Sequence, residues 1–277
     1  MTGDRLGAMA EIADILRRIV DQRRSRVDEI VASGLDTSDR GPATSARPAG
    51  EEPFVERIRS ADGRAVIAEI KMGSPRLGSL VGSVDPERQA RIYAENGAVA
   101  ISVVVEPDFF FGSYELLTRC RQVSGLPVLA KDFVVHPVQL EWARRAGAAA
   151  VLLIAALLSQ RELFDLADQA RQLGLVPLVE CHSLADLRQL AGREWEMIGV
   201  NNRDLSTFEV DLRHSMELLP RMPEESVKVA ESGIRNGADV GQLAVAGFEA
   251  FLVGESLLMA EDPASKLREL VASEASA

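Results

Sequence analysis

The chain has 277 residues, of which 47% are hydrophobic and 26% are charged, which is typical of a folded globular protein with one large domain or two small ones. Its formal net charge of −11 argues against a nucleic-acid partner, because there is no basic face to pair with phosphates. An anionic substrate would have to be held by a few local groups.

Cysteine content and hydropathy bear on where the protein resides. Cys120 and Cys181 are too few for a disulfide framework or a Cys-rich metal site, and we interpret both as reduced thiols. No apolar segment reaches the ~20 residues that a membrane span needs, and the first residues lack the apolar core of a secretion signal. We therefore expect a soluble cytoplasmic protein with no membrane partner. A monomer is expected, because no exposed apolar stripe calls for a second chain.

The chain begins with an amphipathic helix. Residues 9–32 repeat Ile, Leu and Val at helical spacing between charged residues, and Gly34 is a stop signal. Residues 33–53 are rich in Gly, Pro, Ser and Thr without an apolar period, which predicts a linker or lid loop. We interpret residues 1–53 as an N-terminal extension and residues 273–277 as a C-terminal tail.

From residue 65 onwards, short apolar runs of β-forming residues alternate with helical stretches. The runs cover residues 65–71, 99–105, 127–131, 148–155, 175–180, 197–201, 227–231 and 250–254. Amphipathic helices are predicted between them, for example at 86–96, 137–146, 159–173, 212–219 and 239–246.

This alternation predicts an α/β protein with a parallel sheet. Eight runs at intervals of roughly 20 to 35 residues match a (βα)8 TIM barrel, here a single domain over residues 54–272 with the N-terminal helical extension ahead of it. An open doubly wound sheet is the structural alternative.

Most runs become polar at their carboxyl ends, where a barrel carries its chemistry around one opening, the barrel mouth. Glu69 and Lys71 close the first run two residues apart, and therefore on the same face of the strand. A polar residue at one strand end is more often a solvated loop residue. Solvation alone hardly explains polar residues at the carboxyl ends of six of the eight runs. The other five ends are Lys131-Asp132, Glu180, the segment 201–204, Glu231-Ser232-Gly233 and Gly254-Glu255-Ser256.

The last two ends carry glycines. Gly233 in ESGIRNG and Gly254 in LVGESLL follow the seventh and eighth runs, where barrels often bind phosphate. Glycine lets backbone N–H groups approach an anion, and a helix N-terminus adds a favourable dipole. Taken singly, either glycine could merely permit a tight turn, but together they favour a phosphate site. The Gly73-x4-Gly78 spacing is not a nucleotide P-loop, because Ser79 stands where that motif needs Lys.

Lysines and carboxylates are the candidate catalytic groups. His136, His182 and His214 show no metal-ligand spacing, so we interpret them as surface or loop residues and predict no metal site. A lysine desolvated in a barrel mouth can have its pKa lowered, and can then act as a general acid or as a Schiff-base nucleophile. Glu69 or Glu180 could accept a proton if partly buried.

Six segments of the chain, in register, resemble one enzyme family. They are AEIKMGSP at 68–75, LAKDF at 129–133, LVE at 178–180, GVNNRDLSTFEVD at 199–211, AESGI at 230–234 and LVGESLL at 252–258. Together, behind an N-terminal extension, they resemble indole-3-glycerol-phosphate synthase over nearly the whole chain. The resemblance implies a lyase of tryptophan biosynthesis, which converts 1-(2-carboxyphenylamino)-1-deoxyribulose 5-phosphate to indole-3-glycerol phosphate by ring closure, decarboxylation and dehydration, without a cofactor.

The resemblance also implies roles for single residues. The family's general-acid lysine falls on Lys131, and its second lysine, a substrate contact and candidate acid for dehydration, falls on Lys71. The other implied catalytic positions are Glu69 and Glu180, as base or iminium-stabilising groups, and Asn201 and Ser232, as hydrogen-bonding groups. The implied substrate- and phosphate-binding residues are Ser74, Phe109, Phe133, Arg203, Glu231, Gly233, Gly254 and Glu255. Of these, Phe109 and Phe133 would form an apolar wall for the anthranilate ring, or serve core packing only.

The loop after the first run departs from the family pattern. KMGSPRLG stands where the family usually reads KKASPSKG, so Met72, Gly73, Arg76 and Leu77 differ. These differences leave room for a specialised paralogue in a secondary indole pathway. A second alternative is a Schiff-base aldolase with Lys131 as nucleophile, and a third is a non-catalytic sensor of a phosphate ligand. If the protein were such a sensor, some of the catalytic residues implied by the resemblance should be missing. Glu69, Lys71, Lys131, Glu180 and Asn201 are all present.

Overall fold

The computed structural model describes residues 2–34, 53–204 and 209–272, with side chains described from residue 16 onwards. Most of the predicted linker at 33–53 and the whole predicted tail at 273–277 lie outside the described residues. No helix in the described ranges is long and apolar enough to cross a membrane.

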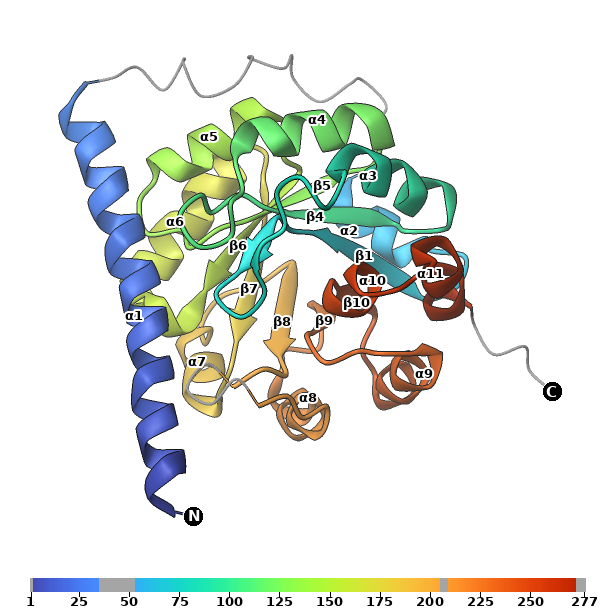
Figure 1. Cartoon of the computed structure of the whole chain (residues 1–277). Helices are drawn as coiled ribbons and strands as arrows, with labels where there is room; N and C mark the ends of the chain where they lie inside the picture. The colour runs from blue at the N-terminus through green and yellow to red at the C-terminus, as the bar shows by residue number, and fades with distance from the viewer. Residues whose placement is uncertain (1, 35–52, 205–208, 273–277) are drawn as a thin grey trace.

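Eight parallel strands close into a barrel, in the order β1-β10-β9-β8-β7-β6-β5-β4 (Figure 1). The strands are β1 (Ala65–Ile70), β4 (Ala100–Val104), β5 (Val128–Lys131), β6 (Ala150–Ile154), β7 (Val176–Cys181), β8 (Met197–Asn201), β9 (Val227–Glu231) and β10 (Ala250–Val253). Each predicted run contains or overlaps one of these strands, so the predicted barrel is confirmed. Closure between β1 and β4 excludes the open doubly wound sheet.

Helices surround the barrel and close its amino-terminal end. They are α2 (Phe54–Arg59), α3 (Pro86–Glu95), α4 (Tyr114–Ser124), α5 (Val138–Ala146), α6 (Gln160–Gln172), α7 (Leu184–Gln189), α8 (Arg213–Leu218), α9 (Gly237–Ala246), α10 (Glu255–Leu258) and α11 (Pro263–Val271). Several begin at a side chain that accepts the free N–H groups of the first turn, as Ser159 and Asn236 do in complete capping boxes.

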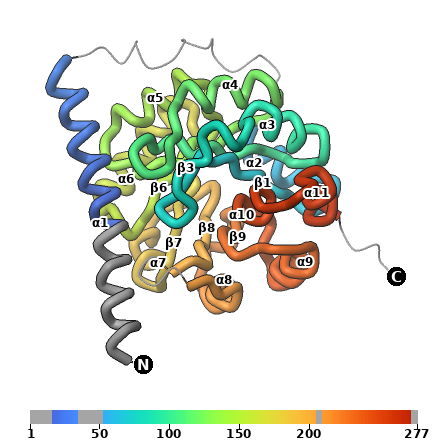
Figure 2. Tube along the Cα trace, viewed as in Figure 1, coloured from blue at the N-terminus to red at the C-terminus, as the bar shows by residue number. Residues whose placement is uncertain are grey.

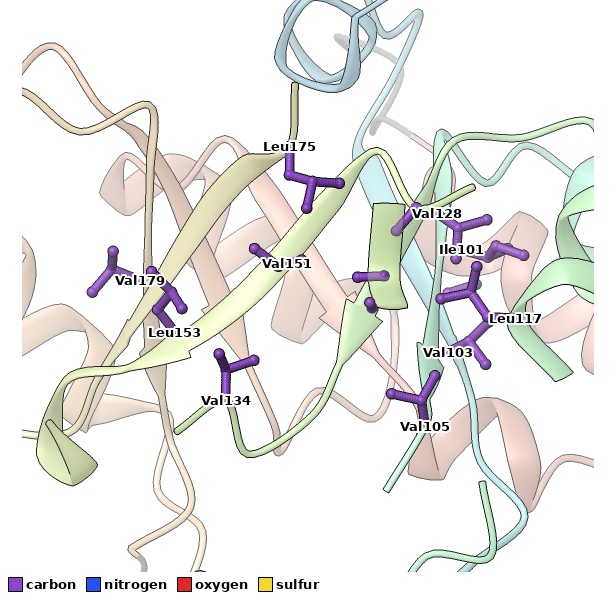
Figure 3. Packing of buried hydrophobic residues seen from close by; sticks show 14 of the residues in the cluster. Ile101, Val103, Val105, Leu117, Val128, Val134, Val151, Leu153, Leu175 and Val179 are labelled. Atoms are coloured by element: carbon purple, nitrogen blue, oxygen red, sulfur yellow. The ribbon is translucent and has the colours of Figure 1, made fainter. Parts of the chain in front are cut away.

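The strands divide the apolar core into two layers, because successive side chains point to opposite faces. The outer layer packs between strands and helices, and Figure 3 shows part of it, including Val103, Val151 and Val179. The inner layer fills the barrel, with Phe54 and Ile58 of α2 packed against the first residues of the strands. α2 therefore closes the amino-terminal end of the barrel and leaves the chemistry to the opposite end.

The predicted N-terminal helix is confirmed as α1 (Thr2–Ala32), which runs along the outside of the barrel beside α5 (Figures 1 and 2). Arg23 of α1 is buried and donates to both oxygens of Asp132, at 2.9 and 2.5 Å. Arg26, one turn later, pairs with Asp108 in the loop after β4. The extension is thus attached to the two loops that follow β4 and β5.

Candidate active site at the carboxyl ends of the strands

The inner face of the barrel becomes polar at the carboxyl ends of four strands. In these strands the residues of the inner layer are Ile67, Leu129, Leu178 and Val229. Two positions further along lie Glu69, Lys131, Glu180 and Glu231. Because the spacing of two keeps a side chain on the same face, all four groups point into the barrel mouth.

Lys131 lies between two carboxylates of other strands. Its Nζ is 2.8 Å from Oε2 of Glu231 and 3.4 Å from Oε2 of Glu180, and both glutamates are almost fully buried. Burial opposes the charged form of Lys131, but the charges of Glu231, Glu180 and Glu69 outweigh it and raise the pKa of the lysine. This corrects the expectation that desolvation lowers the lysine pKa at this mouth. The ammonium form of Lys131 is therefore favoured at this site.

The two glutamates beside Lys131 have opposite pKa shifts. Burial raises the pKa of Glu231 to about 8 against the pull of Lys131, and the charge of Glu180 adds to the rise. Burial also opposes ionisation of Glu180, but Lys131 and His182 lower its pKa. Because the two carboxylates share one environment they titrate as a coupled pair, in which ionisation of Glu180 is favoured over that of Glu231.

Glu69 and Lys71 form a second pair, with Nζ 3.2 Å from Oε1. Gly254 lies directly behind this glutamate, since a Cβ added to Gly254 would overlap Oε1 and lie 3.0 Å from the Cβ of Glu69. Gly199 on β8 stands behind Glu231 in the same way, and an added Cβ would overlap its Oε1. Each glycine makes room for a buried carboxylate, so its small size has a specific cause at this site.

His182 is a loop residue, within the prediction of a surface or loop position, but its side chain belongs to the same inner face and not to the outer surface. It follows Glu180 by two positions, its side chain is only 11% exposed, and its Nε2 is 3.2 Å from Oε1 of Glu180. The signal that could have identified it is the spacing Glu180-x-His182, which repeats that of Glu69-x-Lys71.

The predicted phosphate-binding residues gather after β8, β9 and β10. Nη2 of Arg203 donates to Oε2 of Glu255 at 3.0 Å, and Arg76 of the loop after β1 pairs with the other oxygen of Glu255. Ser232 and Gly233 both have left-handed φ angles, 63° and 81°. A Cβ on Gly233 would overlap Val210, so glycine is required there by close approach as well as by φ.

Asn201 is the last residue of β8, and its side chain contacts both Arg203 and Glu180. Its Oδ1 accepts a hydrogen bond from the backbone N–H of Arg203 at 3.0 Å, and its side chain also hydrogen-bonds Glu180. Asn201 therefore connects the lysine–glutamate cluster with Arg203, a predicted phosphate-binding residue.

The loop after β1 forms a small hairpin of β2 (Gly73–Ser74) and β3 (Gly78–Ser79), labelled in Figure 2 by β3. The Ser74 hydroxyl accepts from the N–H of Leu77 at 3.1 Å, so it stabilises this turn. A Cβ on Gly73 would lie 2.5 Å from both the Gly78 carbonyl oxygen and Cδ2 of Phe111. The departure from Ala to Gly in this loop thus matches its packing against Phe111.

The two phenylalanines of the predicted aromatic wall, Phe109 and Phe133, lie in the loops after β4 and β5. Phe133 packs against the inner layer of the barrel, and its ring centroid lies 6.0 Å from that of Phe110. The backbone N–H of Phe109 donates to the buried carboxylate of Glu106, which also accepts from Asp108 and Phe110. Glu106 is therefore the structural centre of this loop, and the role of Phe109 against a substrate ring stays a prediction.

A closed (βα)8 barrel with lysines and carboxylates clustered at the carboxyl ends of its strands has the architecture of a barrel enzyme. The family model for indole-3-glycerol phosphate synthase matches residues 16–270. The chain is 39% identical over 269 residues to an indole-3-glycerol phosphate synthase of Carboxydothermus hydrogenoformans, covering 93% of this chain and 99% of that protein. It is 42% identical over 262 residues to one of Koribacter versatilis, covering 94% and 97%.

The chain belongs to the indole-3-glycerol phosphate synthase family. It is accordingly an enzyme of the decarboxylating carbon–carbon lyase type, and the relatives give no support to an aldolase or a secondary-pathway paralogue. Among solved structures, 3-hexulose-6-phosphate synthase from Salmonella typhimurium aligns with a TM-score of 0.58 at 15% identity, over 75% of this chain and 96% of that one. That likeness concerns the fold alone.

Proposed function

We propose that this protein converts 1-(2-carboxyphenylamino)-1-deoxyribulose 5-phosphate to indole-3-glycerol phosphate, carbon dioxide and water. Besides family membership, the supporting observation is the ammonium of Lys131 between Glu180 and Glu231 in the barrel mouth. Ring closure on an aromatic carbon requires an electrophilic ketone, and an acid next to the ketone oxygen provides it. The side chains present can carry every proton transfer, so the proposal invokes no cofactor.

In the first step Lys131 donates its proton to the ketone oxygen of the substrate. The ring carbon that bears the carboxylate attacks the ketone carbon, so a carbon–carbon bond forms and the ketone becomes a hydroxyl group. The substrate nitrogen becomes an iminium, and the anionic Glu180 stabilises this positive charge. Loss of carbon dioxide returns the bonding electrons to the ring and restores aromaticity.

In the second half-reaction the hydroxyl group leaves as water. Lys71 is the candidate acid for this departure, because it lies beside Glu69 at the same mouth. An ionised glutamate accepts the proton from the neighbouring carbon, and we assign this role to Glu180, since its pKa is lowered while that of Glu231 is raised. General acid–base steps of this kind typically contribute about 10²–10⁴-fold each.

The substrate phosphate is assigned to the ends of β8, β9 and β10. Backbone N–H groups of Gly233 and Glu255, with the guanidinium of Arg203, would hold it, and Ser232 and Gly254 complete this side of the mouth. Ser74, Asn201 and Phe133 would position the sugar and the aromatic ring. A monomer, a cytoplasmic location, and domain limits at residues 53 and 272 remain part of this proposal.

The Schiff-base aldolase requires a neutral lysine amine as nucleophile. The surroundings of Lys131 favour the ammonium instead, because its carboxylate neighbours raise its pKa. This observation supports the acid role over the nucleophilic one.

The proposed function is tested with the deoxyribulose phosphate substrate and purified protein. Indole fluorescence and released carbon dioxide should rise in equal amounts, and borohydride added during turnover should trap no adduct at Lys131. A covalent adduct on Lys131 would instead establish the aldolase, and the absence of both products would refute the synthase.

A further inference from the structure

The mechanism proposed above leaves His182 without a role, although its ring lies within the catalytic cluster. His182 comes directly after β7 and points to the same inner face as Glu180. Its Nε2 lies 3.2 Å from Oε1 of Glu180, and the two side chains are 11% and 3% exposed. A titratable ring is thus buried against the carboxylate that is expected to act as base.

The position of His182 is fixed through its backbone. Its N–H donates to Oδ2 of Asp186 on α7 at 2.7 Å, and its carbonyl oxygen is 2.8 Å from Nε2 of His214 on α8. Neither ring nitrogen has a hydrogen-bond partner within the described part of the chain. The ring therefore acts on Glu180 by proximity and charge, and an imidazole has that charge only when it is protonated.

Glu180 is also faced by other ionisable groups. Its second oxygen is 3.4 Å from Nζ of Lys131, whose closer partner is Glu231 of β9 at 2.8 Å. Asn201 of β8 adds a neutral hydrogen bond to Glu180. When His182 is protonated, Glu180 lies between two cations, whereas Glu231 has only Lys131 beside it among the ion pairs described.

We propose that His182 is a positioning residue of this site, whose imidazolium charge keeps the negative charge on Glu180 rather than on Glu231 beside Lys131. This inference rests on the proposed function, because it assigns the base of the synthase reaction to the glutamate that His182 contacts. The direction of the pKa of Glu180, lowered by His182 as well as by Lys131 despite burial, agrees with the geometry.

The test is the pH profile of kcat/KM in two variants of His182. His182→Gln removes the charge but keeps a polar side chain. It should move the acid limb of the profile to higher pH by about 1 unit, the low end of the pKa shift that a nearby opposite charge produces. His182→Lys carries a permanent charge and should return the limb towards that of the wild type. His136→Asn, in the loop after β5, is the matched control and should leave the profile unchanged.

The same shift should be visible in the free enzyme. The pKa of Glu180 can be read from carboxyl carbon resonances of 13C-labelled glutamate, assigned with Glu180→Gln, and it should rise by about 1 unit in His182→Gln. Lack of turnover by the wild type would refute the proposed function, while this titration still tests the inference. An unchanged Glu180 pKa, or an activity loss equal at every pH in both His182 variants, would overturn the role of His182.

Discussion

Two glycines give the buried carboxylates of the mouth their space. Gly254 backs Glu69 and Gly199 backs Glu231, and neither glycine has a φ angle in the left-handed region. A methyl group at either position would therefore be tolerated by the backbone but would displace a carboxylate. Their effect on the enzyme should appear in catalysis more than in folding.

We predict that Gly254→Ala lowers kcat/KM by about 10- to 100-fold, because a displacement near 1 Å at a reacting group can cost that much. The control is Gly174→Ala, at a turn with φ 73° and open space around it. That substitution should cost about 1–2 kcal/mol of stability through its left-handed backbone and leave kcat/KM unchanged. Equal kinetic effects of the two substitutions would contradict the steric explanation.

Much of the candidate site could be predicted from the positions of polar residues at the ends of single strands. Glu69, Lys131 and Glu180 were identified from apolar runs that become polar at their ends, and the closed barrel brings them together. The place of His182 in the mouth is not evident from its lack of metal-ligand spacing, and depends instead on its spacing of two from Glu180. The pairing of Phe133 with Phe110 depends on how the Glu106 loop folds, and no periodicity in the sequence encodes that.

At the scale of elements, α1 is joined to the barrel by a buried ion pair. Asp132 directly follows Lys131 and accepts from Arg23, from Tyr114 at 2.9 Å and from Gln139 at 3.0 Å. The amphipathic pattern predicted this helix, but it could not show where the helix packs, because Arg23 and Asp132 are 109 residues apart. The loop that follows Lys131 is thus tied to an element near the start of the sequence.

We expect Arg23→Met to destabilise the protein by about 3–5 kcal/mol, because it leaves the carboxylate of Asp132 buried without its counter-charge. Urea unfolding followed by fluorescence measures this as a lower midpoint at an unchanged slope. Arg161→Ala removes an ion pair whose arginine is 92% exposed, and should change stability by no more than about 0.5 kcal/mol. If Arg23→Met lost as little stability as Arg161→Ala, the Arg23–Asp132 ion pair would be shown not to stabilise the fold.

For the whole molecule, the raised pKa of Glu231 links stability to pH. A carboxyl group whose pKa in the folded state lies above its unfolded value binds its proton more tightly when folded. Its contribution is therefore favourable at low pH and is lost as the pH rises from about 4.5 towards about 8. Glu180, with its lowered pKa, acts mainly below this window, and Lys131, with its raised pKa, acts above it.

Glu231→Gln should accordingly gain stability relative to the wild type as the pH increases. Between pH 5 and pH 8 we expect the difference in unfolding free energy to shift in favour of the variant by at least about 1 kcal/mol. This is a cautious figure, because a pKa shift of a single unit already corresponds to about 1.4 kcal/mol. Glu115→Gln, with a largely exposed side chain, serves as the control and should show no such trend. A pH-independent difference for Glu231→Gln would contradict the raised pKa of Glu231.

The barrel itself was the most predictable feature, since alternating strands and helices of this number leave few arrangements. Closure then fixes which polar strand ends meet, and the lysine–glutamate cluster follows from that closure. The short hairpin after β1 was not predicted, because two-residue strands leave no periodic pattern.

The most direct test of the account is kcat with the carboxyphenylamino-deoxyribulose phosphate for Lys131→Ala, with Lys228→Ala as the matched control. Lys228 lies on β9, where its Nζ contacts the carbonyl oxygens of Glu224 and Ser226 just before that strand. We predict a loss of at least about 10²-fold in kcat for Lys131→Ala, the lower end of typical acid catalysis, and wild-type turnover for Lys228→Ala. Undiminished turnover without the Lys131 ammonium would contradict the mechanism.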